Sequence, residues 1–572
     1  MLINLLLYFY IAFFTYTYGL ILQWISQINK EFKITVTNTS DFFTFSLSGL
    51  AFLMLILGYY SIFAPINGTI HFFLLSIALL FWFKNRQLYK IGFKPLVFLK
   101  INYFQSIVTI IFLLIILICS SSLILWHAYD TGLYHAKFVT WISEFRAIKG
   151  LGNIDGRLAF NSHFYLLTAF FSFNFLQSQV FYALNGFFSI FLLFFFLNTS
   201  FNNKPNRTSL NQFGIYALIL ALYLVTFKFN IYSQYADISS TVLVLFIFIK
   251  LLERISTQEF NCFDYNFYSI MFICFSAPLL KLSSAFLLII PSYFAINMLL
   301  QKQLKNFSKL FFLGTIVLAP WLIRNIIQSG YLIFPFPAID IFDFDWKIPF
   351  SKAVAEKNIT ENYARLVGTH SEAVFNFSQW LKVWWQKTEN LSFVFLCFIA
   401  SSILMLLYVQ ISRKKVKTEF FHLYLLFLSG VVYTHFQAPS LRFVFAPSMA
   451  CVGIAYIIFT EELCSSKLKL YINNVLIALS LLIGVQQLRD PLYLVKQGQE
   501  IKLIHFLVPE NYPLVKTSLK RINDIDIVVP TSGNQCWNEN CLCIDPRFLD
   551  KNICLRGKSI IDGFRINNPN FK

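Results

Sequence analysis

Apolar runs of about 15 to 23 residues recur along the whole chain, and they restrict its fold more than any other feature. A helix of about 20 apolar residues is long enough to cross the hydrocarbon core of a bilayer. Hydrophobic residues occupy 57% of the 572 positions, and charged residues only 13%. Soluble domains carry about 25% charged residues. We therefore expect an all-α polytopic membrane protein.

About fourteen transmembrane helices are predicted from these runs. They lie near residues 2–24, 42–63, 68–83, 104–126, 180–198, 213–230, 238–252, 266–280, 283–300, 308–326, 391–410, 419–435, 443–460 and 468–486. A shorter run, 161–176, combines amides and a histidine with a Phe-rich face, which favours a helix lying in the membrane interface. The alternative, a further crossing, would move Asp237 to the cytoplasmic side.

The basic residues lie mainly in short loops between apolar runs, as the positive-inside rule predicts for cytoplasmic loops. This distribution accounts for the formal net charge of +18, so we do not expect the protein to bind nucleic acid. The most basic loops are 84–100, 250–254, 302–309 and 413–417. Alternating from these loops places 127–160, 328–390 and the tail from about 487 outside. Both termini are then extracytoplasmic, in a cell (inner) membrane.

This topology divides the chain into five parts. They are N-terminal transmembrane helices (1–103), a transmembrane core with the first external loop (104–330), an extracytoplasmic loop (331–390), C-terminal transmembrane helices (391–486) and an extracytoplasmic tail (487–572). In the loop 331–390, Trp380, Trp384 and Trp385 are expected to anchor the chain in the membrane interface.

Four cysteines lie within nineteen residues of the tail: Cys536, Cys541, Cys543 and Cys554. Their spacing, C-x4-C-x-C-x10-C, contains no CxxC pair and no nearby histidine, so a zinc site fits it poorly. An external tail lies in an oxidising compartment, which favours disulfides. We expect two disulfides and keep zinc as the alternative.

The first external loop opens with the polar stretch YDTGLYH, in which Asp130 directly follows an apolar run. A carboxylate at the membrane surface is partly desolvated, and its pKa is easily tuned for work as a general base. Tyr134 and His135 follow about one helical turn later and are candidates for substrate binding. The alternative is that Asp130 is only the N-cap of a helix, a position that favours Asp.

Four basic residues are candidates for binding a phosphate. Lys281, Arg324 and Arg442 are expected at the outer ends of apolar runs, and Arg157 of the first external loop is expected near a lipid headgroup. A charge within a membrane segment is costly, and such residues usually have a partner or a function. Together they predict a clamp for a phosphate group, although each could instead extend its charge to the interface. Asp237 adds a second acidic group at the same level.

In order along residues 104–460, these features resemble the GT-C superfamily of integral membrane glycosyltransferases. That superfamily includes protein O-mannosyltransferases, the aminoarabinose transferases of lipid A and the catalytic subunits of oligosaccharyltransferase. The resemblance rests on Asp130 after a span, YADISS, LLKLSS, PWLIRN with the following G and FP, and PSLRF. More narrowly, YDTGLYH, DWKIP, CW, RG and GF resemble a bacterial branch of large membrane proteins related to that superfamily.

The resemblance implies an inverting transfer of a sugar from a polyprenyl-phosphate donor to an external glycan, lipid or protein acceptor. Asp130 would be the base, and the basic residues would hold the leaving phosphate. No cofactor is expected. Many members carry two adjacent acids where this chain has Asp130 and Thr131, so a divalent cation is not favoured.

Two other functions remain open from the sequence. An O-antigen or polysaccharide polymerase or ligase also acts outside, relies on external arginines, and uses a polyprenyl-diphosphate glycan. A transporter or flippase would carry charges near the bilayer midplane and often shows repeated halves. The charges here are expected at the outer level.

Overall fold

The structure is a computed structural model, and it describes residues 2–26, 39–92, 103–120, 129–176, 181–201, 212–260, 262–369, 371–387, 390–411, 418–496, 508, 512–548 and 550–567. The chain is mostly helical, with a small sheet region near the C-terminus. The helical character agrees with the prediction, whereas the strands were not predicted.

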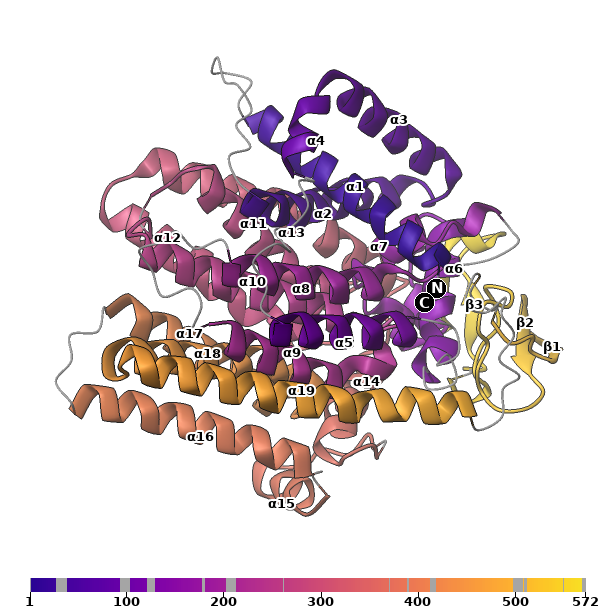
Figure 1. Ribbon diagram of the computed structural model, residues 1–572. Coiled ribbons are helices and arrows are strands. Elements are labelled where there is room, and N and C mark those ends of the chain that lie inside the picture. Colours follow the sequence, from indigo (N-terminus) through magenta and orange to yellow (C-terminus); the bar gives the residue numbers. More distant parts are fainter. Residues whose placement is uncertain are drawn as a thin grey trace.

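Most of the α-helices are gathered in a bundle (Figure 1), and the bounds of all described α-helices follow. They are α1 (Leu2–Ser26), α2 (Thr39–Phe63), α3 (Gly68–Lys84), α4 (Arg86–Gly92), α5 (Tyr103–Cys119), α6 (Ala136–Glu144), α7 (Phe164–Phe171), α8 (Leu184–Phe201), α9 (Phe213–Phe227), α10 (Asp237–Ser256), α11 (Tyr265–Leu280), α12 (Ile289–Leu300), α13 (Leu304–Ser329), α14 (Phe350–Arg365), α15 (Phe377–Lys387), α16 (Asn390–Ile411), α17 (Thr418–Gln437), α18 (Leu441–Leu463) and α19 (Ser466–Lys496).

Short helical turns connect several of these helices. They are η3 (Thr131–His135), η4 (Leu151–Asn153), η5 (Gly156–Ala159), η6 (Asn174–Leu176), η8 (Lys228–Asn230), η9 (Leu282–Leu288), η10 (Pro546–Phe548) and η11 (Ile560–Asp562). Of these, η3 is a π-helix and the others are 3-10 helices.

Seven helices among the described residues are long and apolar enough to cross a membrane. They are Leu2–Ser26, Phe42–Phe63, Phe213–Asn230, Leu282–Leu300, Leu304–Ser329, Leu441–Glu461 and Ser466–Arg489. Several other apolar helices have only 10–17 residues. The structure thus supports a multi-pass membrane protein, while a total of fourteen spans remains a prediction.

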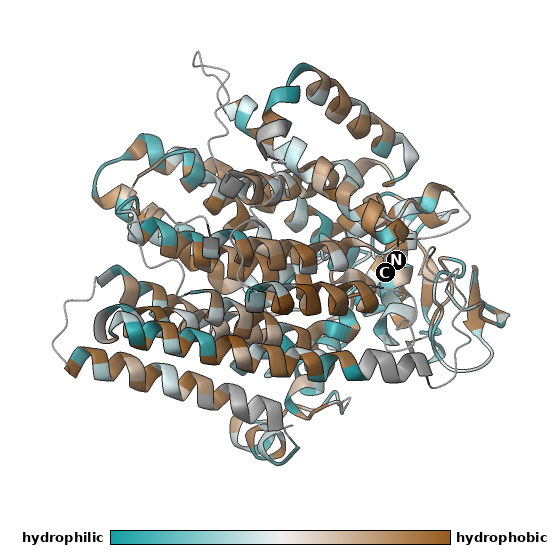
Figure 2. Ribbon diagram, in the orientation of Figure 1, coloured by the Kyte–Doolittle hydropathy of each residue, from teal (hydrophilic) through white to brown (hydrophobic). Residues whose placement is uncertain are grey.

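Apolar residues dominate the helices of the bundle, and hydrophilic residues gather at helix ends and connections (Figure 2). Large apolar side chains also remain exposed on outer helices: Phe72 is 56% exposed, Phe311 66% and Leu482 67%. Water-soluble monomers rarely expose extended apolar faces. Such faces suit contact with lipid.

Close backbone approach joins α1 to α2. A Cβ atom at Gly49 would lie 1.8 Å from the carbonyl oxygen of Thr15, and one at Gly19 would lie 2.0 Å from that of Phe45. Small residues let membrane helices pack with their backbones in contact. These two glycines therefore determine the spacing of the first two helices.

The segment 161–176 forms α7 and η6 and is too short to cross a bilayer. Every residue of α7 is buried. This helix packs against α2 and α6. That this segment does not cross the membrane agrees with its length, and its position in the membrane interface stays a prediction.

The tail contains two antiparallel hairpins: β1 (Thr517–Ile522) pairs with β2 (Ile525–Pro530), and β3 (Ile553–Leu555) with β4 (Phe564–Ile566). They lie at the same end of the bundle as α6, whereas α12 and α17 lie toward the opposite end (Figure 1). Two segments predicted to be external, the first loop and the tail, are therefore neighbours in space.

The tryptophans of α15 only partly match their expected role. Trp380 and Trp384 are buried, and the Trp384 indole donates a hydrogen bond to the carbonyl of Pro439 over 3.0 Å. They hold α15 to the protein and do not reach an interface. Trp385 is 61% exposed and remains suited to an interfacial contact.

Candidate functional site

Asp130 directly precedes the π-helix η3, in which the amide of Ala136 donates to the carbonyl of Thr131. Single π-turns occur frequently at functional sites. The Asp130 side chain makes no capping hydrogen bond, so the alternative role as a helix cap is not supported. Instead, Asp130 is half-buried and lies close to Tyr235. Burial and this neighbouring carboxylate raise the pKa of Tyr235, so its hydroxyl stays protonated.

Aromatic rings surround His135, one helical turn after Asp130. The ring centroids of Tyr134, Tyr235 and Tyr165 lie 4.3, 4.8 and 5.5 Å from that of His135. His135 is buried. Burial and the nearby cations lower its pKa well below the ordinary value, so the imidazole is neutral at pH 7. The positive charge of the site comes from other residues.

Three helix ends meet at Asp237. Asp237 is the first residue of α10 and only 2% exposed, and it forms an ion pair with Lys281, which follows the last residue of α11. Arg442, the second residue of α18, places its Nη1 atom 3.6 Å from Oδ2 of Asp237. A carboxylate in the first turn of a helix also interacts favourably with the helix dipole. Asp237, Lys281 and Arg442, which were expected at the same level, thus form one cluster of charges.

This cluster adjoins Asp130. Both Lys281 and Arg442 are close enough to interact electrostatically with the Asp130 carboxylate. Arg442 also lies over the Tyr235 ring at 5.5 Å. Lys281, Arg442 and Asp237 together keep a positive charge next to Asp130.

Arg157, in η5, lies at the edge of the same group. Its guanidinium is held between the rings of Tyr134 and Phe548, at 5.2 and 4.6 Å from their centroids. Arg157 is 8% exposed, and its Nη1 atom has no hydrogen-bond partner among the described residues. A buried, unpartnered guanidinium N–H is costly. This arrangement is suited to binding an anion.

Two acids on the far side of Arg157 were not predicted as site residues. Glu356 of α14 is 9% exposed, and burial and then the Asp155 carboxylate raise its pKa to about 7. Burial also raises the pKa of Asp155, while Arg157 opposes that shift. Glu356 comes from the loop predicted to be extracytoplasmic and has no recognisable motif around it.

Arg324 does not belong to this group, and the prediction of a four-cation clamp is wrong in this respect. Its side chain is 2% exposed and donates to Asn161 Oδ1 at 3.0 Å and to Ser61 Oγ at 2.7 Å. These neutral partners tie α13 to the start of the α7 segment and to α2. Arg324 therefore acts as a structural link.

A cavity of about 10 Å³ lies beside Asp237 and Arg442, and its lining combines four hydroxyls with apolar side chains. These hydroxyls belong to Ser240, Thr241, Ser283 and Ser284. The cavity holds about one water molecule and is far too small for a sugar. Across the described part of the chain, no three His, Cys, Asp or Glu side chains form a metal site.

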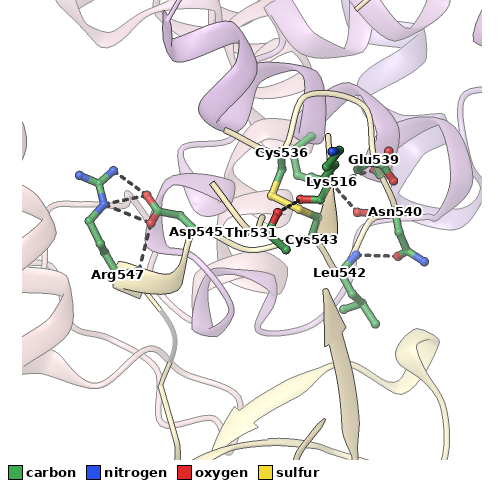
Figure 3. Close-up of a disulfide and its surroundings, with 10 residues drawn as sticks. Lys516, Thr531, Cys536, Glu539, Asn540, Leu542, Cys543, Asp545 and Arg547 are labelled. Carbon is green, nitrogen blue, oxygen red and sulfur yellow. Dashed lines mark hydrogen bonds and ion pairs between the residues drawn. A yellow bond between two sulfur atoms is a disulfide. The ribbon is translucent and has the colours of Figure 1, made fainter. Parts of the chain in front are cut away.

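The tail forms one disulfide, between Cys536 and Cys543 (Figure 3). The expected second disulfide is absent from the described residues, because Cys541 and Cys554 are free thiols. Cys541 is buried and donates to Glu144 Oε2 over 3.1 Å, and Cys554 lies in β3. The two sulfurs thus lie in different environments and do not pair. The spacing of the cysteines in the sequence could not reveal this difference.

The structure adds aromatic residues that the sequence interpretation missed. Tyr235 lies within the quoted YADISS motif, two residues before Asp237, so its position was a usable signal. Tyr165 lies in a Phe-rich run, where nothing distinguishes it. Trp537 and Phe548 belong to the tail and reach the site only through tertiary contacts.

Comparison with known proteins gives one match. No curated protein and no solved structure matches the chain. One protein-family model matches residues 1–449, which include Asp130, Asp237, Lys281 and Arg442 but not the cysteine-containing tail. The chain therefore belongs to the family described as Domain of unknown function (DUF8201).

Proposed function

We propose that this protein is a membrane glycosyltransferase that moves a sugar from a polyprenyl-phosphate donor to an extracytoplasmic acceptor with inversion. One observation carries the proposal. The half-buried carboxylate of Asp130 caps no helix and lies beside Lys281 and Arg442. A base next to a positively charged group is the combination that this transfer needs.

In the proposed reaction, Asp130 accepts the proton of an acceptor hydroxyl, whose oxygen attacks the anomeric carbon of the sugar. The bond between that carbon and the phosphate oxygen breaks, and the electron pair leaves with the phosphate. Lys281, Arg442 and Arg157 stabilise the negative charge that develops on the leaving group. Tyr235, whose hydroxyl stays protonated, lies next to Asp130 and orients its carboxylate.

The charge balance favours an anionic substrate. Lys281, Arg442 and Arg157 are cationic, Asp130 and Asp237 are anionic, and His135 is neutral, which leaves an excess of positive charge. The excess is one charge, so ionised Asp155 alone would cancel it, and ionised Glu356 would then make the balance negative. Burial raises the pKa of both carboxyls, which favours their neutral forms. The pKa of Glu356, about 7, keeps much of that carboxyl protonated near neutral pH.

We place this site on the extracytoplasmic side, where both termini also lie, in the cell (inner) membrane. The positive-inside distribution supports this orientation. Nucleotide sugars are absent there, which makes a lipid-linked donor the suitable substrate. Glycan, lipid or protein hydroxyls remain open as acceptors.

The test compares strains that carry the wild type or Asp130→Asn, by mass spectrometry of envelope glycans and polyprenyl-linked sugars. Asp526→Asn, an exposed substitution in the tail, is the matched control. We expect Asp130→Asn to remove one sugar from a glycan while its lipid-phosphate donor accumulates. Accumulation of a diphosphate-linked repeat unit would instead identify a polymerase or ligase. Unchanged pools would refute both and favour a transporter.

A further inference from the structure

The tail is attached to the turn that carries Asp130. Cys536 and Trp537 both donate their main-chain amides to the carbonyl oxygen of Gly132, over 3.0 and 2.8 Å. Gln535 Nε2 donates to the carbonyl of Tyr129 over 2.9 Å, and the Tyr129 hydroxyl donates to Asn534 Oδ1 over 2.7 Å. These bonds hold the backbone on both sides of Asp130.

Side-chain packing strengthens this attachment. The indole of Trp537 lies against Gly132, where an added Cβ would approach its ring carbons to 2.6 Å. Trp537 is 6% exposed, and its ring also packs on Tyr512, 4.9 Å away. A large side chain next to a glycine leaves the turn little freedom to shift.

Two further contacts extend the attachment along the first external loop. The Lys137 ammonium donates to the carbonyl oxygens of Glu539 and Asn540, and the Cys541 thiol donates to Glu144. Both loop residues belong to α6, directly after the π-helix. Lys137 is 3% exposed, so these carbonyl acceptors satisfy a buried charge.

The disulfide closes the part of the tail that makes these contacts. Cys536 and Cys543 enclose Trp537, Glu539, Asn540 and Cys541 in one short loop. Farther along, Phe548 covers Arg157. One segment, residues 534–548, therefore contacts residues on either side of the base, the following helix and one cation of the site.

We propose that residues 534–548 are a functional component of the site and that Trp537 is a positioning residue for Asp130. This inference rests on the proposed function. The segment lies outside the matched family region, residues 1–449. It holds the turn at residues 129–132 so that the Asp130 carboxylate faces Tyr235 and the cations.

The experiment uses the purified full-length protein in detergent with three variants: Trp537→Ala, Trp537→Phe and, as control, Leu519→Ala. Leu519 lies in β1 of the same tail and is 70% exposed. Hydrogen exchange in a peptide spanning residues 129–142 measures the attachment without relying on any activity. Steady-state transfer with a polyprenyl-phosphate sugar measures kcat and KM.

We expect Trp537→Ala to raise exchange in this peptide about tenfold or more and to lower kcat about tenfold to a hundredfold. The KM for the donor should change little, because the cations remain. Trp537→Phe should retain most of both properties, and Leu519→Ala all of them.

Two results separate the failure of this inference from that of the proposed function. Unchanged exchange and unchanged kcat in Trp537→Ala, with normal protection of β1 and β2, would overturn the positioning role. A wild-type protein that transfers no sugar would overturn the proposed function, and the exchange measurement would then decide the attachment alone. If Trp537→Ala does not fold, Trp537→Phe is measured in its place. Its hydrogen exchange must then stay near that of the wild type.

Discussion

Nη1 of Arg442 lies 3.6 Å from Oδ2 of Asp237, and the same carboxylate also pairs with Lys281. The side chain of Asp237 is 1% exposed, whereas those of its two partners are about a quarter exposed. A single buried carboxylate thus joins three helix ends that lie far apart in the chain. It balances two cations that the proposed reaction needs.

Removing this carboxylate should destabilise the protein. Asp237→Asn leaves Lys281 and Arg442 without their counter-charge, and breaking a buried ion pair costs about 3–5 kcal/mol. The partial exposure of both cations favours the lower end of this range. Thermal unfolding in detergent checks the prediction. Asp526→Asn, whose side chain is 58% exposed, should shift stability by less than about 0.5 kcal/mol. Equal melting temperatures for both variants would contradict the role of Asp237.

The pH dependence of stability should carry a contribution from Glu356. Its pKa rises on folding from 4.5 to about 7, so the folded state binds more protons than the unfolded state between these values. This contribution is therefore present below about pH 4.5 and is lost as pH rises through about 7. Glu356→Gln should make the loss of stability with rising pH smaller. The measurement is the difference in melting temperature between pH 5 and pH 8. Glu259→Gln, an exposed site at the other end of the bundle, should keep the wild-type difference.

Gly49→Ala should separate α1 from α2. The added methyl group would lie 1.8 Å from the Thr15 carbonyl oxygen, which belongs to the backbone and cannot rotate away. Overpacking of this kind costs about 1–3 kcal/mol. Gly68→Ala, whose nearest contact is a Phe175 ring atom at 3.3 Å, serves as the control in the same unfolding measurement. A Gly49→Ala protein as stable as this control would show that the two helices are not in backbone contact.

Cysteine labelling in intact cells checks the proposed orientation. Val374→Cys, at a position 83% exposed in the loop predicted to be extracytoplasmic, should react with a membrane-impermeant maleimide. Gln258→Cys, exposed after α10, should react only after permeabilisation. Both variants are compared with a background that lacks Cys262, Cys464 and Cys554, the free thiols that are not buried among the described residues. The reverse labelling pattern would invert the topology and move the site to the cytoplasm.

The helical membrane character of the chain could be predicted because it is local information. A run of apolar residues forms a helix and faces lipid or other helices whatever its distant neighbours are. The interruption at Lys281 was visible for the same reason, and so was the polar stretch at Asp130. Local patterns do not show how long each helix becomes, so the number of spans was less well determined.

Membership of the site depended on tertiary contacts. Arg324 and Arg442 look alike in the sequence, each beside an apolar run, but α13 directs Arg324 to Ser61 and Asn161 while α18 directs Arg442 to Asp237. Likewise, four similar cysteines divide into a disulfide and two free thiols. Burial and the distance to a partner distinguish the residues in each set. Neither property can be read from the spacing of residues in the sequence.

By itself, the sequence determined the apolar helices, the positions of the basic loops from which an orientation is predicted, and a set of acids and cations expected near one surface. Only the tertiary structure decided which of these meet, that Tyr235 contacts Asp130, and that the tail folds into hairpins and reaches back to Gly132. The physical reason is the distance along the chain over which each effect acts. Hydrophobic patterning acts on neighbouring residues, whereas a site built from helix ends depends on how distant segments pack.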